Sequence, residues 1–220
     1  MIKTYDHIIW DWNGTLLNDV ELCLGIINNI ISKRDLPTIS LDYYQEIFTF
    51  PVKDYYQKAG LDFSKYPFEL LGMEWIMEYE KRKLEAELFP NALGTLKSIQ
   101  KSGRGQSILS AYSQKDLVEI VTYFRLNDFF QHISGLDNIY ATSKIDLGIE
   151  LIDKLDIPND RIILIGDTIH DFEVSREIGT DCILIAKGHQ SKSRLMNCGV
   201  PVLDSLDHIN SFLGIDPTVL

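Results

Sequence analysis

Acidic residues stand at two places where a run of apolar residues ends. Asp11 interrupts the stretch "IIWDW" near the N-terminus, and Asp167 closes "RIILIGD", with Asp171 a short distance beyond it. Carboxylates that share an edge of a sheet repel one another unless a cation lies between them. Hard oxygen donors of this kind suit Mg²⁺, with water completing the octahedron. The pattern therefore predicts a magnesium site formed by Asp11, Asp167 and Asp171.

Two further residues supply the groups that a phosphate requires. Ser110 ends the strand-like stretch "QSILS", and Lys144 begins the helical stretch "KIDLGIELIDKL", just before "RIILIGD". A hydroxyl donor and a positive charge both suit a phosphate oxygen. Ligands of open parallel sheets bind at the carboxyl ends of the strands, so we expect these groups to meet Asp11. An aspartate, a metal and a lysine together indicate phosphoryl transfer through an aspartyl-phosphate.

Each of these residues also has a purely structural interpretation. A single aspartate at a strand end is most often a turn or capping residue, and Asp171 could be the N-cap of "FEVSREIG". Ser110 could cap the following helix, and most lysines are solvated. The combination of residue types, each at a strand end or a helix start, is what favours a catalytic site.

The elements that must position these residues follow an alternating pattern. Strand-like segments are separated by helical patterns, which is typical of a parallel sheet with helices on both faces. The apolar run from Ile162 to Ile165 has the composition of a strand buried on both sides. We therefore predict an α/β fold with a Rossmann-like parallel sheet. The predicted strands lie within "HIIWDW", "QSILSA", "HISG", "RIILIGD" and "DCILIA".

The alternation stops between Thr15 and Pro90, where about seventy residues pass with no convincing strand. Apolar residues recur there at helical spacing from Val20 and again from Phe68, and Ser40 has the position of an N-cap. The many aromatic residues of this segment are expected to form the core of a small helical bundle. We predict an α/β core made of residues 1–15 and 90–220, with a helical cap domain of residues 16–89 inserted after the first strand.

Composition narrows the class of protein. The chain has 220 residues, of which 45% are hydrophobic, and a net charge of -11. This charge argues against a nucleic-acid partner, although a bound metal could still attract a small anionic substrate. The three cysteines show no close pairing, so disulfide and zinc interpretations are both weak. No signal peptide or membrane-length apolar run is visible, so we expect a cytoplasmic protein with no membrane partner.

Taken in order, these motifs resemble the haloacid dehalogenase superfamily. "DWNGTL" is similar to its first motif, Asp-x-Asp-Gly-Thr-Leu, and "ILSA" to its second, an apolar strand that ends in Ser or Thr. Lys144 matches the third motif, and "GDTIHD" matches the Gly-Asp-x-x-x-Asp form of the fourth. The position of the insert resembles the cap of subclass I. The stretch from Asp167 to Ser191 resembles the phosphoglycolate phosphatase-like branch.

The resemblance implies roles for individual residues. Asp11 would be the nucleophile, and it would bind Mg²⁺ together with the backbone carbonyl of Asn13 and with Asp167. Asp171 would support the metal site or hold the lysine. The remaining implied residues contact the transferring group or form the turn toward the cap: Gly14, Thr15, Ser110, Ala111 and Lys144.

Asn13 departs from the family pattern. Phosphatases of this family place there an aspartate that protonates the leaving group, and an amide cannot exchange a proton usefully near neutral pH. One interpretation is a slow or selective phosphatase of a small phosphorylated metabolite whose leaving group needs little protonation, such as an acyl or aryl phosphate. A second is a binding or regulatory protein that keeps the pocket without rapid turnover.

A third interpretation is a phosphonatase-like hydrolase of C–P bonds, a branch that also lacks an acid at this position. That branch requires a cap lysine that forms a Schiff base, and Lys53 in "FPVKDYY" is the candidate. A dehalogenase is disfavoured because the acidic pair Asp167 and Asp171 indicates a metal. A mutase is disfavoured because it relies on the missing acid.

Overall fold

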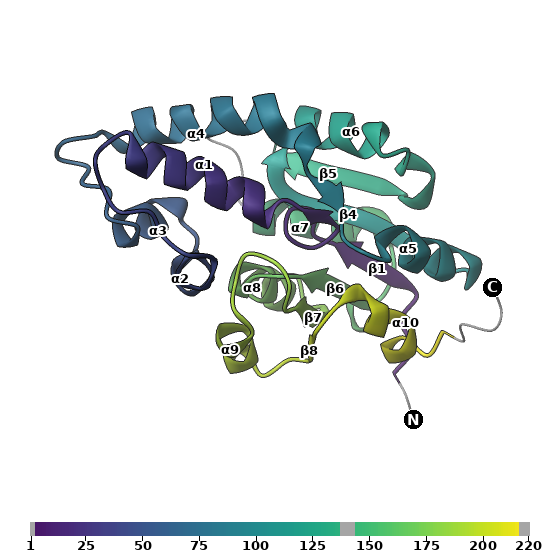
Figure 1. Ribbon diagram of the computed structural model, residues 1–220. Helices are drawn as coiled ribbons and strands as arrows, with labels where there is room; N and C mark the ends of the chain where they lie inside the picture. The colour runs from purple at the N-terminus through teal and green to yellow at the C-terminus, as the bar shows by residue number, and fades with distance from the viewer. Residues whose placement is uncertain (1–2, 137–143, 216–220) are drawn as a thin grey trace.

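The computed structural model describes residues 3–136 and 144–215. Within them, a sheet of six parallel strands has the order β5-β4-β1-β6-β7-β8 (Figure 1). Each of the predicted strands is present, and β8, only two residues long, was not predicted. The strands are β1 (His7–Trp10), β4 (Gly105–Ser113), β5 (His132–Leu136), β6 (Ile162–Gly166), β7 (Asp181–Ile185) and β8 (Val202–Leu203). The predicted Rossmann-like α/β fold is confirmed.

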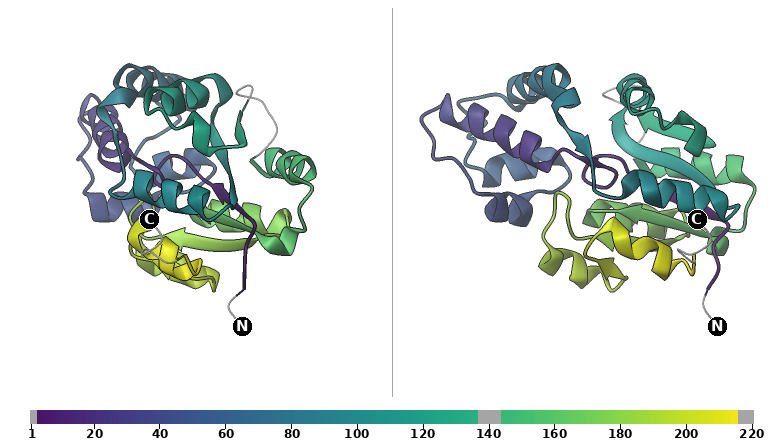
Figure 2. Two further views of the ribbon diagram at one scale, coloured as in Figure 1. Left: turned by 90° about the vertical axis from the view of Figure 1, so that its right-hand side faces the viewer. Right: turned by 45° about the vertical axis from the view of Figure 1, so that its right-hand side comes forward.

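Helices cover both faces of this sheet (Figures 1 and 2). Alternate side chains of β1 point to opposite faces, because successive residues of a strand alternate in direction. Ile8 and Trp10 pack in one buried cluster, and Ile9 packs in another with residues of α7 and α8. The helices of this part of the chain are α5 (Ala92–Lys101), α6 (Gln114–Tyr123), α7 (Lys144–Leu155), α8 (Ile169–Glu177), α9 (Lys192–Leu195) and α10 (Ile209–Phe212).

The part of the chain between β1 and α5 forms a helical insert that projects from the sheet (Figure 2). It contains α1 (Val20–Ser32), α2 (Leu41–Ile47), α3 (Val52–Lys58) and α4 (Phe68–Arg82). Two short antiparallel strands, β2 (Leu17–Asn18) and β3 (Glu87–Leu88), pair where the chain leaves and re-enters the core. Ser40 caps α2 as predicted, since its hydroxyl accepts a hydrogen bond from the Tyr43 amide at 3.2 Å. The assignment of residues 16–89 to a separate domain stays a prediction.

Short 3₁₀ turns connect several of these elements. Their bounds are Lys83–Glu85, Asn127–Phe129, Asn159–Arg161, Met196–Cys198 and Leu206–His208. Within the described residues, no helix is both long and apolar enough to cross a membrane.

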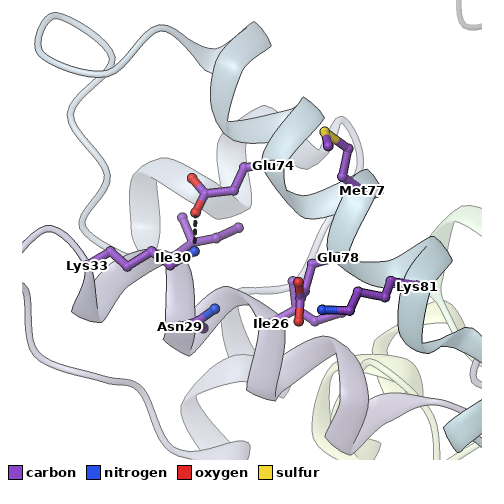
Figure 3. Close-up of a pocket in the computed structure, with 8 residues that line it drawn as sticks. All are labelled: Ile26, Asn29, Ile30, Lys33, Glu74, Met77, Glu78 and Lys81. Atoms are coloured by element: carbon purple, nitrogen blue, oxygen red, sulfur yellow. Dashed lines mark hydrogen bonds and ion pairs between the residues drawn. The ribbon is translucent and has the colours of Figure 1, made fainter.

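Several aromatic residues of the insert form its core, as expected, but not all of them. Tyr44, Tyr55, Tyr56 and Tyr79 are buried, whereas Tyr43 and Phe50 are exposed. On the outer side of the insert, a groove of about 240 Å³ lies between α1 and α4 (Figure 3). An ion pair between Lys33 and Glu74 crosses this groove at 2.8 Å. None of the residues that line the groove is one of the predicted site residues.

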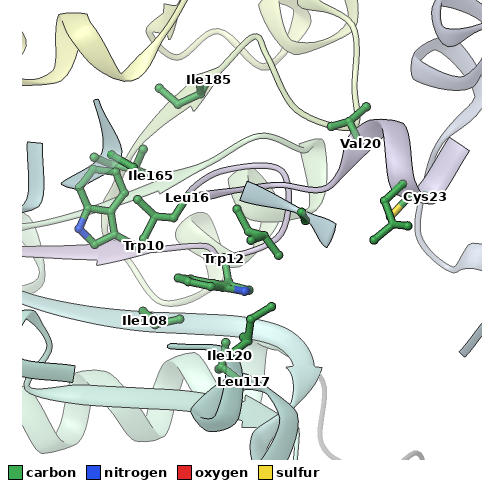
Figure 4. Close-up of a cluster of buried hydrophobic side chains, with 14 of the residues drawn as sticks. Trp10, Trp12, Leu16, Val20, Cys23, Ile108, Leu117, Ile120, Ile165 and Ile185 are labelled. Carbon is green, nitrogen blue, oxygen red and sulfur yellow. The ribbon is translucent and has the colours of Figure 1, made fainter. Parts of the chain in front are cut away.

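A continuous apolar cluster joins the sheet to the insert (Figure 4). It runs from Trp10 and Ile165 on the sheet through Trp12 and Leu16 to Cys23 on α1. Both tryptophans and Leu16 are fully buried. Burial of side chains this large stabilises a fold by roughly 1.5–3 kcal/mol each, so this cluster fixes where the insert begins relative to β1.

Hydrogen bonds also hold the insert against the core on the side of α2. The Arg194 guanidinium donates to the carbonyls of Gln45 and Phe48 at 2.9 and 2.6 Å. Gln190 donates to the Phe48 carbonyl at 2.9 Å, and Gln45 donates to the Gly188 carbonyl at 2.8 Å. The segment that follows β7 is therefore hydrogen-bonded to α2 and to Phe48, which follows it.

Candidate active site

Asp11 lies immediately beyond β1 in a buried position, with 7% of its surface exposed. Its amide continues the ladder by donating to the Ile165 carbonyl at 2.8 Å, which fixes the backbone at the strand end. The Thr15 hydroxyl lies 3.1 Å from Asp11 Oδ2 and 2.9 Å from Asp167 Oδ1. These two carboxylates, which the sequence separates by much of the chain, therefore face each other across one hydroxyl.

Gly14 makes this approach possible. Its backbone has φ +76°, in the left-handed region that residues with side chains rarely adopt, and a Cβ there would clash with Asp167 Oδ2. The turn after β1 thus requires glycine both for its conformation and for the space that Asp167 occupies.

Lys144 is the cation of the site. From the first position of α7, its ammonium donates to Asp11 Oδ1 at 2.6 Å and to Asp171 Oδ1 at 2.5 Å. All three side chains are almost fully buried. Burial alone would lower the pKa of Lys144, but the two carboxylates outweigh it and raise that pKa. The lysine is therefore a permanent positive charge beside Asp11.

Asp171 binds Lys144 and also contacts the N-terminus of its own helix, α8. Thr168, not Asp171, is the N-cap of α8, which corrects the capping interpretation. Asp171 completes a capping box, in which its Oδ2 accepts from the Thr168 amide at 3.0 Å and the Thr168 hydroxyl at 2.7 Å. Burial would raise the pKa of Asp171, but Lys144 and the Thr168 hydroxyl lower it overall. Of the two roles implied for Asp171, this geometry favours holding the lysine.

Burial and mutual repulsion make the other two carboxylates harder to ionise. Burial raises the pKa of Asp11 to about 6, with Lys144 opposing the shift and Asp171 adding to it. Burial raises the pKa of Asp167 to about 8, with His189 opposing and Asp11 adding. Carboxylate oxygens of Asp11, Asp167 and Asp171 all lie within 4.8 Å of one another. Crowded hard oxygen donors of this kind fit a divalent cation such as Mg²⁺.

These pKa values predict that Mg²⁺ binding displaces a proton. A cation competes with protons on Asp11 and Asp167, so the apparent affinity for Mg²⁺ should rise by up to about tenfold per pH unit between about pH 6 and about pH 8. Titration calorimetry in buffers with different ionisation enthalpies measures the released proton directly. Asp167→Asn should remove most of the release, and an affinity that does not change with pH would contradict the prediction.

The same pKa shifts determine the direction in which the stability of the metal-free protein changes with pH. A carboxyl pKa that folding raises favours the folded state at low pH, so that stability is lost as pH rises from about 4 toward about 8. Mg²⁺ should therefore raise Tm more at about pH 8 than at about pH 6, as measured by differential scanning calorimetry.

The Asn13 side chain is held by two residues of the insert. Its Nδ2 donates to Asp19 Oδ2 at 2.8 Å and to the Tyr79 hydroxyl at 2.6 Å. The Tyr79 hydroxyl in turn donates to Asp19 Oδ2 at 2.8 Å, so the tyrosine oxygen accepts from the amide. Both N–H groups of the Asn13 side chain therefore donate within the protein. The other polar atom of that side chain, Oδ1, can only accept a hydrogen bond.

Sequence reasoning missed Asp19 and His189. Asp19 precedes α1 but makes no capping hydrogen bond, and its Oδ1 instead accepts from the Gly14 amide at 3.0 Å and pairs with His189 Nε2 at 3.2 Å. Burial would lower the pKa of His189, but Asp19 and Asp167 raise it to about 9. Its backbone amide also donates to Asp167 Oδ2 at 2.6 Å. An acidic residue at a helix start and a histidine after a Gly were the available signals, and neither is specific.

Ser110 and Ala111 lie on β4, the strand next to β1. Ser110 is buried inside β4, which continues to Ser113, and its hydroxyl accepts from the Tyr112 amide at 3.1 Å. The pairing of β4 with β1 ends at Ile108. Ser110 and Ala111 therefore lie in a part of β4 that is not paired with β1. Ser113, not Ser110, precedes α6. Among the described residues, Ser110 has no hydrogen bond to Asp11, so a role at a bound phosphate stays a prediction.

Lys53 belongs to a different environment. Its ammonium lies over the rings of Phe63 and Phe68, 5.5 and 5.8 Å from their centroids. Within residues 3–136 and 144–215, no hydrogen bond or ion pair joins Lys53 to the carboxylates. The structure thus gives no support to a Schiff-base role.

Comparison with known proteins identifies the family. Residues 8–185 match the family described as haloacid dehalogenase-like hydrolase. The chain belongs to this family. Enolase-phosphatase E1 of Naegleria gruberi is 25% identical to this hydrolase over 189 residues, which are 83% of this chain and 74% of the relative.

Solved structures of similar fold span nearly the whole hydrolase. A haloacid dehalogenase-like family hydrolase from Streptococcus pneumoniae has a TM-score of 0.81 at 18% identity, covering 94% of this chain and 98% of its own. A structure described as a predicted phosphoglycolate phosphatase, from Haemophilus somnus, has a TM-score of 0.76 at 16% identity, covering 94% and 97%. At these identities the likeness establishes the fold.

Proposed function

We propose that this hydrolase is a Mg²⁺-dependent phosphatase of small phosphorylated metabolites, which acts through a phosphorylated Asp11. The observation that carries the proposal is the position of Asp11, with one oxygen on the Lys144 ammonium and the other facing Asp167 across Thr15. Family membership and a relative named as a phosphatase add support. A role as a phosphate-binding protein without turnover is the competing proposal.

The residues of the site divide the work of phosphoryl transfer. An Asp11 oxygen forms the new bond to phosphorus as the bond to the leaving oxygen breaks. The leaving oxygen keeps the electron pair of the broken bond. Lys144 balances negative charge on Asp11 and on the incoming phosphate, and Asp171 holds the lysine in place. Asp11, the carbonyl of residue 13 and Asp167 would hold Mg²⁺, which when bound neutralises charge on the phosphoryl oxygens. Water then releases phosphate from Asp11.

We further propose that the enzyme prefers phosphates whose leaving groups depart without a proton. Asn13 gives both of its N–H groups to Asp19 and Tyr79, and so it has none for the leaving oxygen. A leaving group of low pKa, as in an acyl or aryl phosphate, needs no such donor. An alkyl phosphate lacks this advantage and should react slowly, because general acid catalysis is typically worth about 10² to 10⁴ in rate.

Replacing Asn13 by aspartate tests this proposal. The new carboxyl would face Asp19, and the repulsion would keep a proton on the pair, which is the form that a general acid requires. We expect Asn13→Asp to raise kcat/KM for an alkyl phosphate by about 10² to 10⁴, and to change that for an acyl phosphate far less. The measurement is kcat/KM across a series of phosphates of increasing leaving-group pKa.

Asn18→Asp is the matched control, because it adds the same charge at an exposed position close by. It should leave the dependence on leaving-group pKa unchanged. Equal rates for alkyl and aryl phosphates in the natural chain would contradict the preference. A chain that binds phosphate but turns over none of the series would contradict the phosphatase itself and favour the binding role.

A further inference from the structure

Three side chains of different chemistry meet where the helical insert leaves the core. Asp19 and Cys23 come from the start of α1, one helical turn apart, and His189 comes from the segment after β7. His189 Nε2 lies 3.2 Å from Asp19 Oδ1, and Cys23 Sγ lies 3.5 Å from Asp19 Oδ2. All three donor atoms lie within 4.8 Å of one another, and all three residues are buried.

We propose that Asp19, Cys23 and His189 form a second metal site, which takes a thiophilic divalent cation of the Zn²⁺ class. Thiolate, imidazole and carboxylate together are ligands that Zn²⁺ accepts, whereas Mg²⁺ requires oxygen. The site is therefore chemically distinct from the all-oxygen cluster at Asp11. It does not depend on whether the protein is a phosphatase.

The two oxygens of Asp19 face the other two donors. Oδ1 lies 3.2 Å from His189 Nε2, and Oδ2 lies 3.5 Å from Cys23 Sγ. In a tetrahedral zinc site with bonds of about 2.0–2.3 Å, neighbouring ligand atoms lie roughly 3.3–3.6 Å apart. One Asp19 oxygen would bind the ion, and the three donor atoms, which lie within 4.8 Å of one another, would move to that spacing.

Tyr44 provides a second observation that points to a ligand role for His189. Its hydroxyl lies 2.9 Å from His189 Nδ1, the ring nitrogen that does not face Asp19. Histidines that bind metals usually have this other nitrogen hydrogen-bonded, which fixes the ring and directs Nε2 toward the metal. Phe48 stacks on the same ring at 4.9 Å between centroids and further restrains it.

The Asp19 carboxylate lies between the other two donors, because it pairs with His189 and accepts a hydrogen bond from the Cys23 thiol. Because two ligands come from the insert and one from the core, the metal would join the two parts of the chain.

Metal analysis of the purified full chain tests the proposal. We expect one equivalent of zinc after incubation with Zn²⁺ and dialysis, retained in excess Mg²⁺. Co²⁺ in its place should give the thiolate-to-metal charge-transfer band and the intense visible bands of a tetrahedral site. Absence of both the zinc and the charge-transfer band would overturn the proposal.

Cysteine variants assign the band to one residue. Cys182 is buried like Cys23 and is the matched control, so Cys182→Ala should keep the band whereas Cys23→Ala should lose it. If Cys23→Ala does not fold, the double variant Cys182→Ala, Cys198→Ala is used instead, because Cys23 is then the only cysteine left. The charge-transfer band should persist in that variant, and its loss would overturn the assignment to Cys23. Tyr44→Phe should weaken zinc binding by about 10- to 100-fold.

Asp11→Asn separates this site from the proposed function. That variant should bind zinc as the natural chain does, even though it lacks the proposed nucleophile. Zinc lost equally in Asp11→Asn and Cys23→Ala would overturn the proposal of a separate site. Zinc bound by a chain that turns over no phosphate would leave the second site standing and the phosphatase refuted.

Discussion

Asp11→Asn is expected to reduce phosphatase turnover by roughly 10³-fold or more, because it removes the proposed nucleophile. An amide oxygen cannot form the phosphorylated intermediate, and it is also a weaker ligand for Mg²⁺. The change is nearly isosteric, so the position of the turn after β1 should persist. Initial rates with an aryl phosphate at saturating Mg²⁺ measure the effect.

The same variant should be no less stable than the natural chain without metal. Asp11 is one of two buried carboxylates with raised pKa values, and removing its charge relieves the repulsion with Asp167. Lys144 keeps its other partner, Asp171. Asp6→Asn, which changes a partly exposed aspartate paired with Arg161, is the control and should retain full turnover. A rate within tenfold of the natural chain would exclude Asp11 as the nucleophile.

Lys144→Met is expected to lower the free energy of unfolding by about 3–5 kcal/mol as well as to abolish turnover. Methionine fills a similar volume but leaves Asp11 and Asp171 buried without the cation that both contact. Loss of one partner of a buried ion pair costs this much because the remaining charge stays out of water. Urea denaturation at neutral pH, without metal, measures the change.

The penalty should shrink at lower pH, where the uncompensated carboxylates take up protons. Lys154→Met is the matched control on α7, because Lys154 pairs with Glu150 at 3.7 Å with both side chains more than half exposed. Exposed pairs contribute about 0–1 kcal/mol, so this variant should be close to the natural chain in stability. A similar small effect for Lys144→Met would show that the buried lysine is not the counter-charge of the site.

The sequence by itself predicted the elements and the reactive residues at their ends. Local patterns suffice for this, since a continuous apolar run such as Ile162 to Ile165 specifies a buried strand and a helical period specifies α1 and α4. Asp11, Asp167 and Lys144 could be expected to meet because parallel strands bring their carboxyl ends to one edge. The structure brings these three together with Thr15 and Asp171.

Only the tertiary structure decided what surrounds Asn13. Asn13 and Asp19 both lie in "DWNGTLLND", but nothing in this stretch indicates that they bind each other. Nor does it indicate that Tyr79 of α4 binds the Asn13 amide, or that His189 approaches Asp19. The contacts with Tyr79 and His189 join residues far apart in the chain, and their geometry depends on how the insert packs against the core. The cysteine count likewise gave no sign of a metal site, because a site made of one cysteine, one histidine and one aspartate has no sequence spacing to recognise.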